Sequence, residues 1–118
     1  MLSFATTSLA VLSMGALAYS PGPFFQSKTV IIPHDDKIKR GGEDAADSCD
    51  TALAVADGVG GWADVGVNPG LFSAALTKQV IKEHEENPDL SPVELVHDAC
   101  EKASGEHLGS ATLVVLTV

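Results

Sequence analysis

The stretch Val55-Ala56-Asp57-Gly58-Val59-Gly60-Gly61-Trp62 joins an apolar run to a glycine-rich turn. The run, residues 51–56, has acidic residues before it and glycines after it, which predicts a buried strand. Asp57 follows directly, and a carboxylate at a strand end is held rigidly, as a ligand or catalyst requires. The adjacent glycine lets the backbone approach a bound ion and offer its carbonyl oxygen. Hard cations such as Mg²⁺ and Mn²⁺ take both kinds of oxygen, although a hairpin in which Asp57 only orders the turn is the alternative.

The same glycines formally match a dinucleotide-binding pattern, Gly58-x-Gly60-x-x-Ala63. Three features argue against that interpretation. Asp57 would place a negative charge beside the pyrophosphate, and the next helix begins near Pro69, too late for its N-terminus to hold a phosphate. No clear strand ending in an acidic residue follows about 20 residues later.

Carboxylates are concentrated around this stretch without basic residues to balance them. No Lys or Arg occurs between Arg40 and Lys78. The acidic residues of that interval are Glu43, Asp44, Asp47, Asp50, Asp57 and Asp64. Carboxylates that fold close together repel, and protonation or a bound cation must relieve the repulsion. We interpret Asp47, Asp50 and Asp64 as solvated loop charges, and Glu43, Asp44 and Asp57 as the candidates for a site.

The composition limits the size and the partners of the protein. The 118 residues allow one small domain or part of a larger one, and a hydrophobic content of 45% is sufficient for a core. The formal net charge of −9 argues against nucleic acid as a partner. Cys49 and Cys100 form no CxxC pair, so we interpret them as ordinary thiols rather than as a disulfide framework or a zinc site.

Residues 1–20 differ from the rest because they contain no Asp, Glu, Lys or Arg. The apolar stretch from Leu9 to Ala18 ends in Ala16-Leu17-Ala18, which suits signal-peptide cleavage, but no basic residue precedes it. We interpret residues 1–20 as an apolar leader, with a secretory signal, another targeting segment or a part of the fold as open alternatives. Ser, Thr and Gly within the stretch weaken a membrane span, and we expect no stable one. Pro21-Gly22-Pro23 is the expected boundary of the leader.

Two helices are predicted from apolar spacing and from their caps. The first begins near Pro69 with Asn68 as N-cap and is stopped by Asn87-Pro88. The second follows a capping box of Ser91 and Glu94 and ends near Gly105 as C-cap. We expect His84 and His97 to lie on the surfaces of these helices.

Strands are predicted at residues 28–32, 51–56 and 110–118, with a loop at residues 34–42. The last strand is apolar at nearly every position, which favours cover on both faces. Because the chain ends inside that strand, we expect a truncated domain.

Four motifs in order resemble the metal-dependent protein phosphatases of the protein phosphatase 2C type. They are Gly41-Gly42-Glu43-Asp44-Ala45, residues 55–62, Gly66-Val67-Asn68-Pro69 and Gly109-Ser110-Ala111-Thr112. One branch of this family consists largely of mitochondrial or plastid enzymes. The sequence resembles that branch in residues 55–62, in the following segment 66–73 and in Ile32-Pro33-His34-Asp35-Asp36-Lys37. The similarity covers residues 28–118, which we interpret as the N-terminal part of such a domain.

The resemblance implies an α+β fold, part of a four-layer α-β-β-α sandwich. It also implies hydrolysis of phosphoserine and phosphothreonine in phosphoprotein substrates by a water that two Mn²⁺ or Mg²⁺ ions activate. Asp57 would bridge the two metals, while Glu43 and the Gly58 carbonyl would bind one of them. Asp44 would act through a metal-bound water. The family domain is longer and its later half supplies further aspartate ligands, so we expect the 118-residue chain alone to be inactive.

The resemblance does not decide which residue binds the substrate phosphate or whether the protein is catalytically active. The family's basic residue lies four positions before the Glu, where Lys39 stands, with Arg40 next to it; an ammonium cannot clamp phosphate in a bidentate manner. Trp62 is a packing anchor or, alternatively, a substrate platform. The second hypothesis for function is a non-catalytic, phosphatase-like binding module. We expect a monomer, and the compartment is secretory or, by the resemblance, a mitochondrion or plastid.

Overall fold

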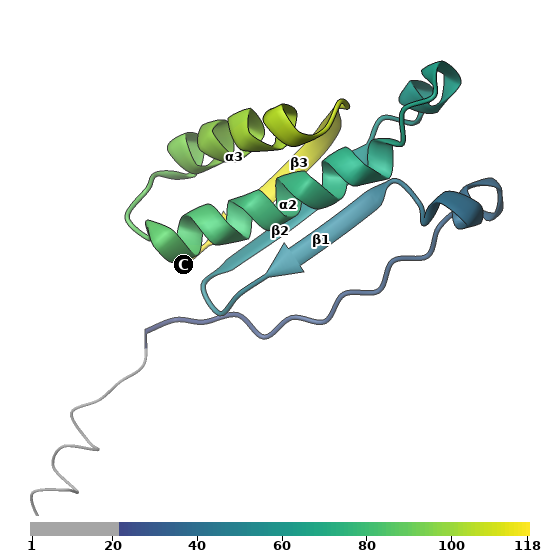
Figure 1. Ribbon diagram of the computed structural model, residues 1–118. Coiled ribbons are helices and arrows are strands. Elements are labelled where there is room, and N and C mark those ends of the chain that lie inside the picture. Colours follow the sequence, from purple (N-terminus) through teal and green to yellow (C-terminus); the bar gives the residue numbers. More distant parts are fainter. Residues whose placement is uncertain (1–21) are drawn as a thin grey trace, which may run out of the picture.

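The computed structural model describes residues 22–118, so the predicted leader at residues 1–20 lies outside the described residues. Two 3-10 helices, three strands and two α-helices follow one another along this part of the chain (Figure 1). In chain order they are η1 (Asp35–Arg40), β1 (Asp44–Ser48), β2 (Ala52–Gly58), η2 (Gly60–Val65), α2 (Pro69–Glu86), α3 (Pro92–Glu106) and β3 (Ala111–Thr117).

The three strands form one antiparallel sheet in the order β1-β2-β3, so β2 is its central strand. Burial alternates along β2 with the period of a strand that is covered on one face. Ala52, Ala54, Ala56 and Gly58 are buried, whereas Val55 points to the opposite face and is 54% exposed. The small side chains of β2 allow the helices to approach the sheet closely.

Helices α2 and α3 lie side by side over this alanine face (Figure 1). The core between the helices and the sheet contains apolar residues of both helices, at the helical spacing that the sequence predicts. Its buried members are Ala52, Ala54, Ala56, Phe72, Ala75, Leu76, Val80, Ile81, Leu95, Ala99 and Ala103. The predicted amphipathic helices are therefore confirmed.

The helix starts follow their predicted caps. The Asn68 side chain accepts a hydrogen bond from the Gly70 N–H at 3.0 Å, and Pro69 is the first helical residue. Ser91 and Glu94 form the reciprocal capping box. The predicted C-cap at Gly105 is wrong, because the helix continues through Gly105 to Glu106 and His107 is the cap.

Two predictions along the first half of the chain are wrong, and one strand was not predicted. Residues 28–32 have no ladder partner and belong to no strand; they run past the edge strand β1 (Figure 1). The predicted loop at residues 34–42 contains η1, which Gly41 ends in the left-handed conformation with φ 84°. Strand β1 was not predicted, because Asp-Ala-Ala-Asp-Ser has little β propensity and its pairing with β2 decides its conformation.

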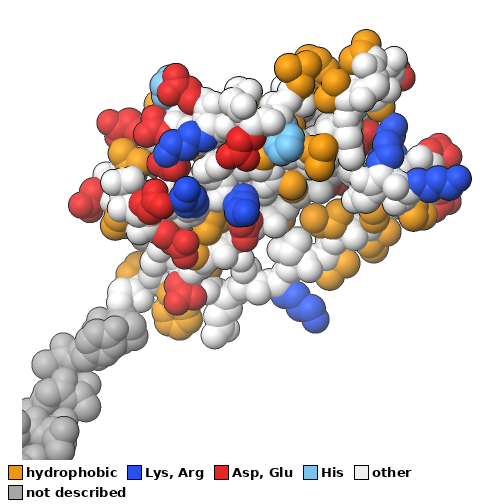
Figure 2. All heavy atoms as spheres, in the orientation of Figure 1, with side chains coloured by type: hydrophobic (Ala, Val, Ile, Leu, Met, Phe, Trp, Pro, Cys, Tyr) orange, Lys and Arg blue, Asp and Glu red, His pale blue; other side chains and the backbone are white. Residues whose placement is uncertain are grey.

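The sheet face opposite the helices has no second layer among residues 22–118. Val55, Val114 and Leu116 on this face are 54%, 62% and 54% exposed. The described residues thus provide one helix layer and one sheet, which confirms the predicted α+β class. Acidic and basic side chains are interspersed over the helix-bearing face (Figure 2). No helix of the described part combines the length and the apolar character needed to cross a membrane.

Candidate metal and phosphate site

The β1–β2 hairpin brings the candidate ligands together at one end of the sheet. Asp44 and Asp57 are directly opposite each other in the strand register. One step beyond them, the Gly58 N–H donates to the Glu43 carbonyl at 3.0 Å. Residues 43–44 and 57–58, which were predicted as metal ligands and catalytic residues, are therefore neighbours across one ladder.

Two glycines after the strand allow this close approach. A Cβ on Gly58 would lie 2.6 Å from the Glu43 carbonyl oxygen and 2.6 Å from Ser73 Oγ. A Cβ on Gly60 would lie 2.9 Å from Glu43 Oε2. Both positions need glycine for space rather than for an unusual φ, since neither has a positive φ. The motif residues thus pack the turn against the Glu43 side chain.

The paired aspartates repel each other. Desolvation and then the nearby Asp57 carboxylate raise the pKa of Asp44 above its usual value of 3.8. The side chains of Asp44 and Asp57 are both exposed to solvent at this end of the hairpin. A cation placed between them would relieve this repulsion.

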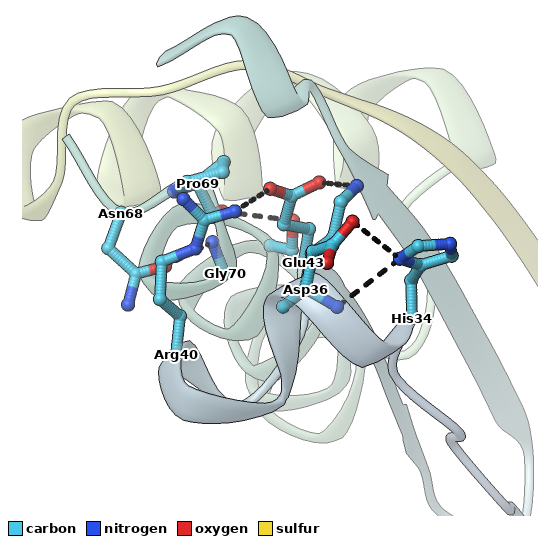
Figure 3. Close-up of polar contacts among 9 residues, drawn as sticks. His34, Asp36, Arg40, Glu43, Asn68, Pro69 and Gly70 are labelled. Carbon is cyan, nitrogen blue, oxygen red and sulfur yellow. Dashed lines mark hydrogen bonds and ion pairs between the residues drawn. The ribbon is translucent and has the colours of Figure 1, made fainter. Parts of the chain in front are cut away.

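Glu43 differs from the aspartates because its carboxylate is buried, with 3% of the side chain exposed. Lys37 Nζ donates to Oε2, and Arg40 Nη2 donates to Oε1 at 3.1 Å (Figure 3). Both cations come from η1, which lies over the end of the hairpin. A buried carboxylate needs such partners, and here η1 supplies them.

The predicted phosphate-binding pair is divided between two environments. Arg40 lies at the site through its bond to Glu43, whereas Lys39 is exposed and has no ion-pair partner in the described part of the chain. Sequence analysis missed Lys37. Its spacing of three from Arg40 places both on one side of a 3-10 helix, but this signal required η1 to be recognised. His34 accepts from the Asp36 N–H at 3.4 Å and starts that helix.

The candidate ligands have the oxygen atoms that a hard cation prefers, but they do not form a complete metal site. Glu43, Asp44, Asp57 and Gly58 are neighbours in the backbone at one end of the sheet, and carboxylate and carbonyl oxygens suit Mg²⁺ or Mn²⁺. Within residues 22–118, no three His, Cys, Asp or Glu side chains are arranged to hold an ion. The Glu43 carboxylate is turned instead toward Lys37 and Arg40.

Two further predictions concern residues outside the candidate site. The prediction that His84 lies on the surface is wrong: it is 4% exposed, and its Nε2 lies 2.9 Å from Thr51 Oγ1 in the β1–β2 turn. Helix α2 packs its last turn on this hairpin, which covers the imidazole. Trp62 donates from Nε1 to Ser110 Oγ at 2.9 Å and so connects η2 to the residue before β3.

Comparisons with known proteins point to one family. The chain is 39% identical over 95 residues to "Probable protein phosphatase 2C 80" of Arabidopsis thaliana, covering 76% of this chain and 23% of that protein. It is 43% identical over 93 residues to "Probable protein phosphatase 2C 1" of Oryza sativa subsp. japonica, covering 74% of this chain and 27% of that protein.

A solved structure agrees with these relatives. The photosystem II phosphatase PBCP matches with a TM-score of 0.63 and 37% identity, over 74% of this chain and 35% of that one. No family model matches the chain. The chain spans about a fifth to a quarter of the length of the curated relatives that it matches.

Proposed function

Because the chain belongs to the protein phosphatase 2C family, we propose that the protein removes phosphate from phosphoserine and phosphothreonine in phosphoproteins with Mn²⁺ or Mg²⁺. The observation that carries this proposal is the hairpin end, where the backbone places Glu43, Asp44, Asp57 and Gly58, residues of two of the family's motifs, next to one another. The names of the relatives support a protein substrate, and the oxygen-rich donor set supports a hard cation.

The resemblance to the family gives each residue of the hairpin end a proposed role. Asp57, at the exposed end of β2, would hold the metal ions together with Glu43 and the Gly58 carbonyl, whose oxygen atoms suit hard cations. Asp44 holds a water from the opposite strand. When bound, the two ions supply an activated water and neutralise charge on the phosphate. Lys39 and Arg40 attract the phosphate as cations at the edge of the site.

The decisive experiment uses the full-length product of the gene, because we expect the 118-residue chain alone to be inactive; the substrates are p-nitrophenyl phosphate and a phosphopeptide. We expect hydrolysis with Mn²⁺ and none with chelator. Asp57→Asn should lower the rate at least about 10- to 100-fold, the loss typical even of outer-shell partners of a metal. Asp64→Asn is the matched control, because Asp64 is an exposed carboxylate of η2. Chelator-resistant hydrolysis, or equal rates in the two variants, contradicts the proposal.

A non-catalytic phosphatase-like binding module is the second candidate. The observation that favours it is that no three acidic, His or Cys side chains are arranged around an ion in residues 22–118. A module would bind a phosphopeptide and hydrolyse neither substrate with Mn²⁺. The same assay, combined with a phosphopeptide pull-down, therefore separates the two candidates.

For the compartment we propose an organelle, a mitochondrion or a plastid. The resemblance of residues 55–73 to a largely organellar branch supports this, and so does the description of the structural relative as a photosystem II phosphatase. A fluorescent protein fused behind residues 1–27 should reach the organelle. Secretion of the fusion contradicts the proposal.

A further inference from the structure

The buried Glu43 carboxylate has a cation on each of its oxygens. Lys37 Nζ meets Oε2, and Arg40 Nη2 meets Oε1 at 3.1 Å (Figure 3). Glu43 is 3% exposed, whereas Lys37 and Arg40 are 38% and 39% exposed. The carboxylate is therefore fixed in the interior, and its partners are the half-exposed, movable members of the cluster.

The two cations belong to one short element. Both lie on η1, three residues apart, and η1 has no buried residue of its own. Few packing contacts hold such an element, so its ion pairs with Glu43 contribute much of its attachment to the hairpin. Loss of these pairs would free η1 without disrupting the core beneath α2 and α3.

The position of the cations conflicts with the role proposed for Glu43. A divalent ion would require the same carboxylate oxygens, and it would be repelled by an ammonium and a guanidinium beside them. A buried carboxylate without any counter-charge is also strongly unfavourable. One positive group or the other must therefore accompany Glu43.

We propose that Lys37 and Arg40 are an internal counter-ion for Glu43, and that a divalent cation binds by displacing them and releasing η1. This inference rests on the proposed function, because it takes Glu43 as a metal ligand. Lys37 and Arg40 thereby lower the affinity for the metal and stabilise the protein in its absence.

Metal affinity tests the competition directly. Mn²⁺ is titrated into the 118-residue chain, followed by calorimetry and by quenching of Trp62, the one tryptophan of the chain. Lys37→Met removes the charge and retains the stem. Lys78→Met is the matched control, since Lys78 is exposed on α2 and has no ion-pair partner within residues 22–118. We expect Lys37→Met to bind Mn²⁺ roughly three- to tenfold more tightly than Lys78→Met.

Thermal unfolding in chelator is the second readout. Lys37→Met should lower the melting temperature more than Lys78→Met does. In a Glu43→Gln background, where no buried charge needs a partner, this difference should disappear.

The outcomes separate this inference from the proposed function. Equal Mn²⁺ affinities of Lys37→Met and Lys78→Met, with binding lost in Glu43→Gln, overturn the counter-ion inference and leave the metal site standing. Absence of Mn²⁺ binding in the wild type and in Lys37→Met overturns both, because removal of the competitor should reveal the site. A melting-temperature difference that persists in Glu43→Gln also overturns the inference.

Discussion

At the scale of single residues, the glycines after Asp57 differ in how much room they leave for a side chain. Gly58→Ala places a methyl group 2.6 Å from a backbone oxygen of Glu43 and from Ser73 Oγ, and the backbone oxygen belongs to the strand ladder. We expect this substitution to lower the free energy of unfolding by about 1–3 kcal/mol, as overpacking does. Urea unfolding measures the effect.

Gly61→Ala is the control for this prediction, because nothing lies within 4 Å of the added methyl group. It should leave the free energy of unfolding within about 0.5 kcal/mol of the wild type. If Gly58→Ala is equally harmless, the close packing of the turn on Glu43 is not as described.

Because Asp44 and Asp57 face each other, we expect the stability of the protein to depend on pH. The pKa of Asp44 is raised in the folded protein by desolvation and by Asp57, so the folded state binds a proton that the unfolded state releases. The stability from this proton is complete below the usual pKa of 3.8 and is lost as pH rises through the higher folded value. Asp44→Asn should therefore raise the melting temperature at neutral pH, by about 2 °C for an exposed pair, and have no such effect below pH 3.8.

Asp47→Asn serves as the reference for Asp44→Asn. Asp47 is exposed on the same strand but stands opposite Ala54, not a carboxylate. A neutral-pH gain of equal size in both variants would assign the effect to net charge instead of to the Asp44–Asp57 pair.

The sequence predicted those parts of the site whose position is indicated by the residues next to them in the chain. Asp57 and Gly58 follow an apolar strand, and that context indicates their position directly. That Glu43 lies beside them depends on β1 pairing with β2, which no periodicity in residues 44–48 indicates. The counter-charges of Glu43 come from η1, and their identity follows only from the three-dimensional structure.

At the scale of elements, the capping box before α3 is the clearest local signal. Ser91 Oγ and Glu94 satisfy each other's backbone groups, and the Ser91 hydroxyl and then its N–H lower the pKa of Glu94. We expect Ser91→Ala to lower the free energy of unfolding by about 1 kcal/mol at neutral pH. The stability from Glu94 is complete above its usual pKa of 4.5 and is lost as pH falls through the lower folded value.

The difference between wild type and Ser91→Ala should therefore shrink on acidification below pH 4.5, as chemical unfolding at several pH values will measure. Ser104→Ala, at an exposed position in the last turn of the same helix, should cause no loss at any pH. A constant difference across the acidic range argues against a contribution from Glu94.

The elements differ in how far they could be predicted because different forces decide them. Helices α2 and α3 have apolar stripes and polar caps at their starts, so local sequence specifies them. Residues 28–32 have the β-branched composition of a strand, but they lie beside the edge of the sheet without a ladder. Strand β1 has the opposite properties: a weak composition and a full set of partners on β2. Pairing, not propensity, decides both segments.

At the scale of the whole molecule, the helices among residues 22–118 cover one face of the sheet. The continuous apolar character of residues 110–118 favoured cover on both faces of the last strand. Among the described residues, α2 and α3 cover one of these two faces. Val114 and Val115 are consecutive residues of β3 on opposite faces. Val114 is 62% exposed, whereas Val115 packs against the core.

These neighbours test whether the second face is open. In the 118-residue chain, Val114→Thr should change the free energy of unfolding by less than about 0.5 kcal/mol, while Val115→Thr should cost about 1–2 kcal/mol because it places a hydroxyl against the core. Chemical unfolding measures both. In any longer form in which a second layer covers the face, as in the family fold, Val114→Thr should become as costly as Val115→Thr. Equal costs in the 118-residue chain itself would mean that this face is already covered, by self-association or by another part of the chain, and dilution would distinguish the two.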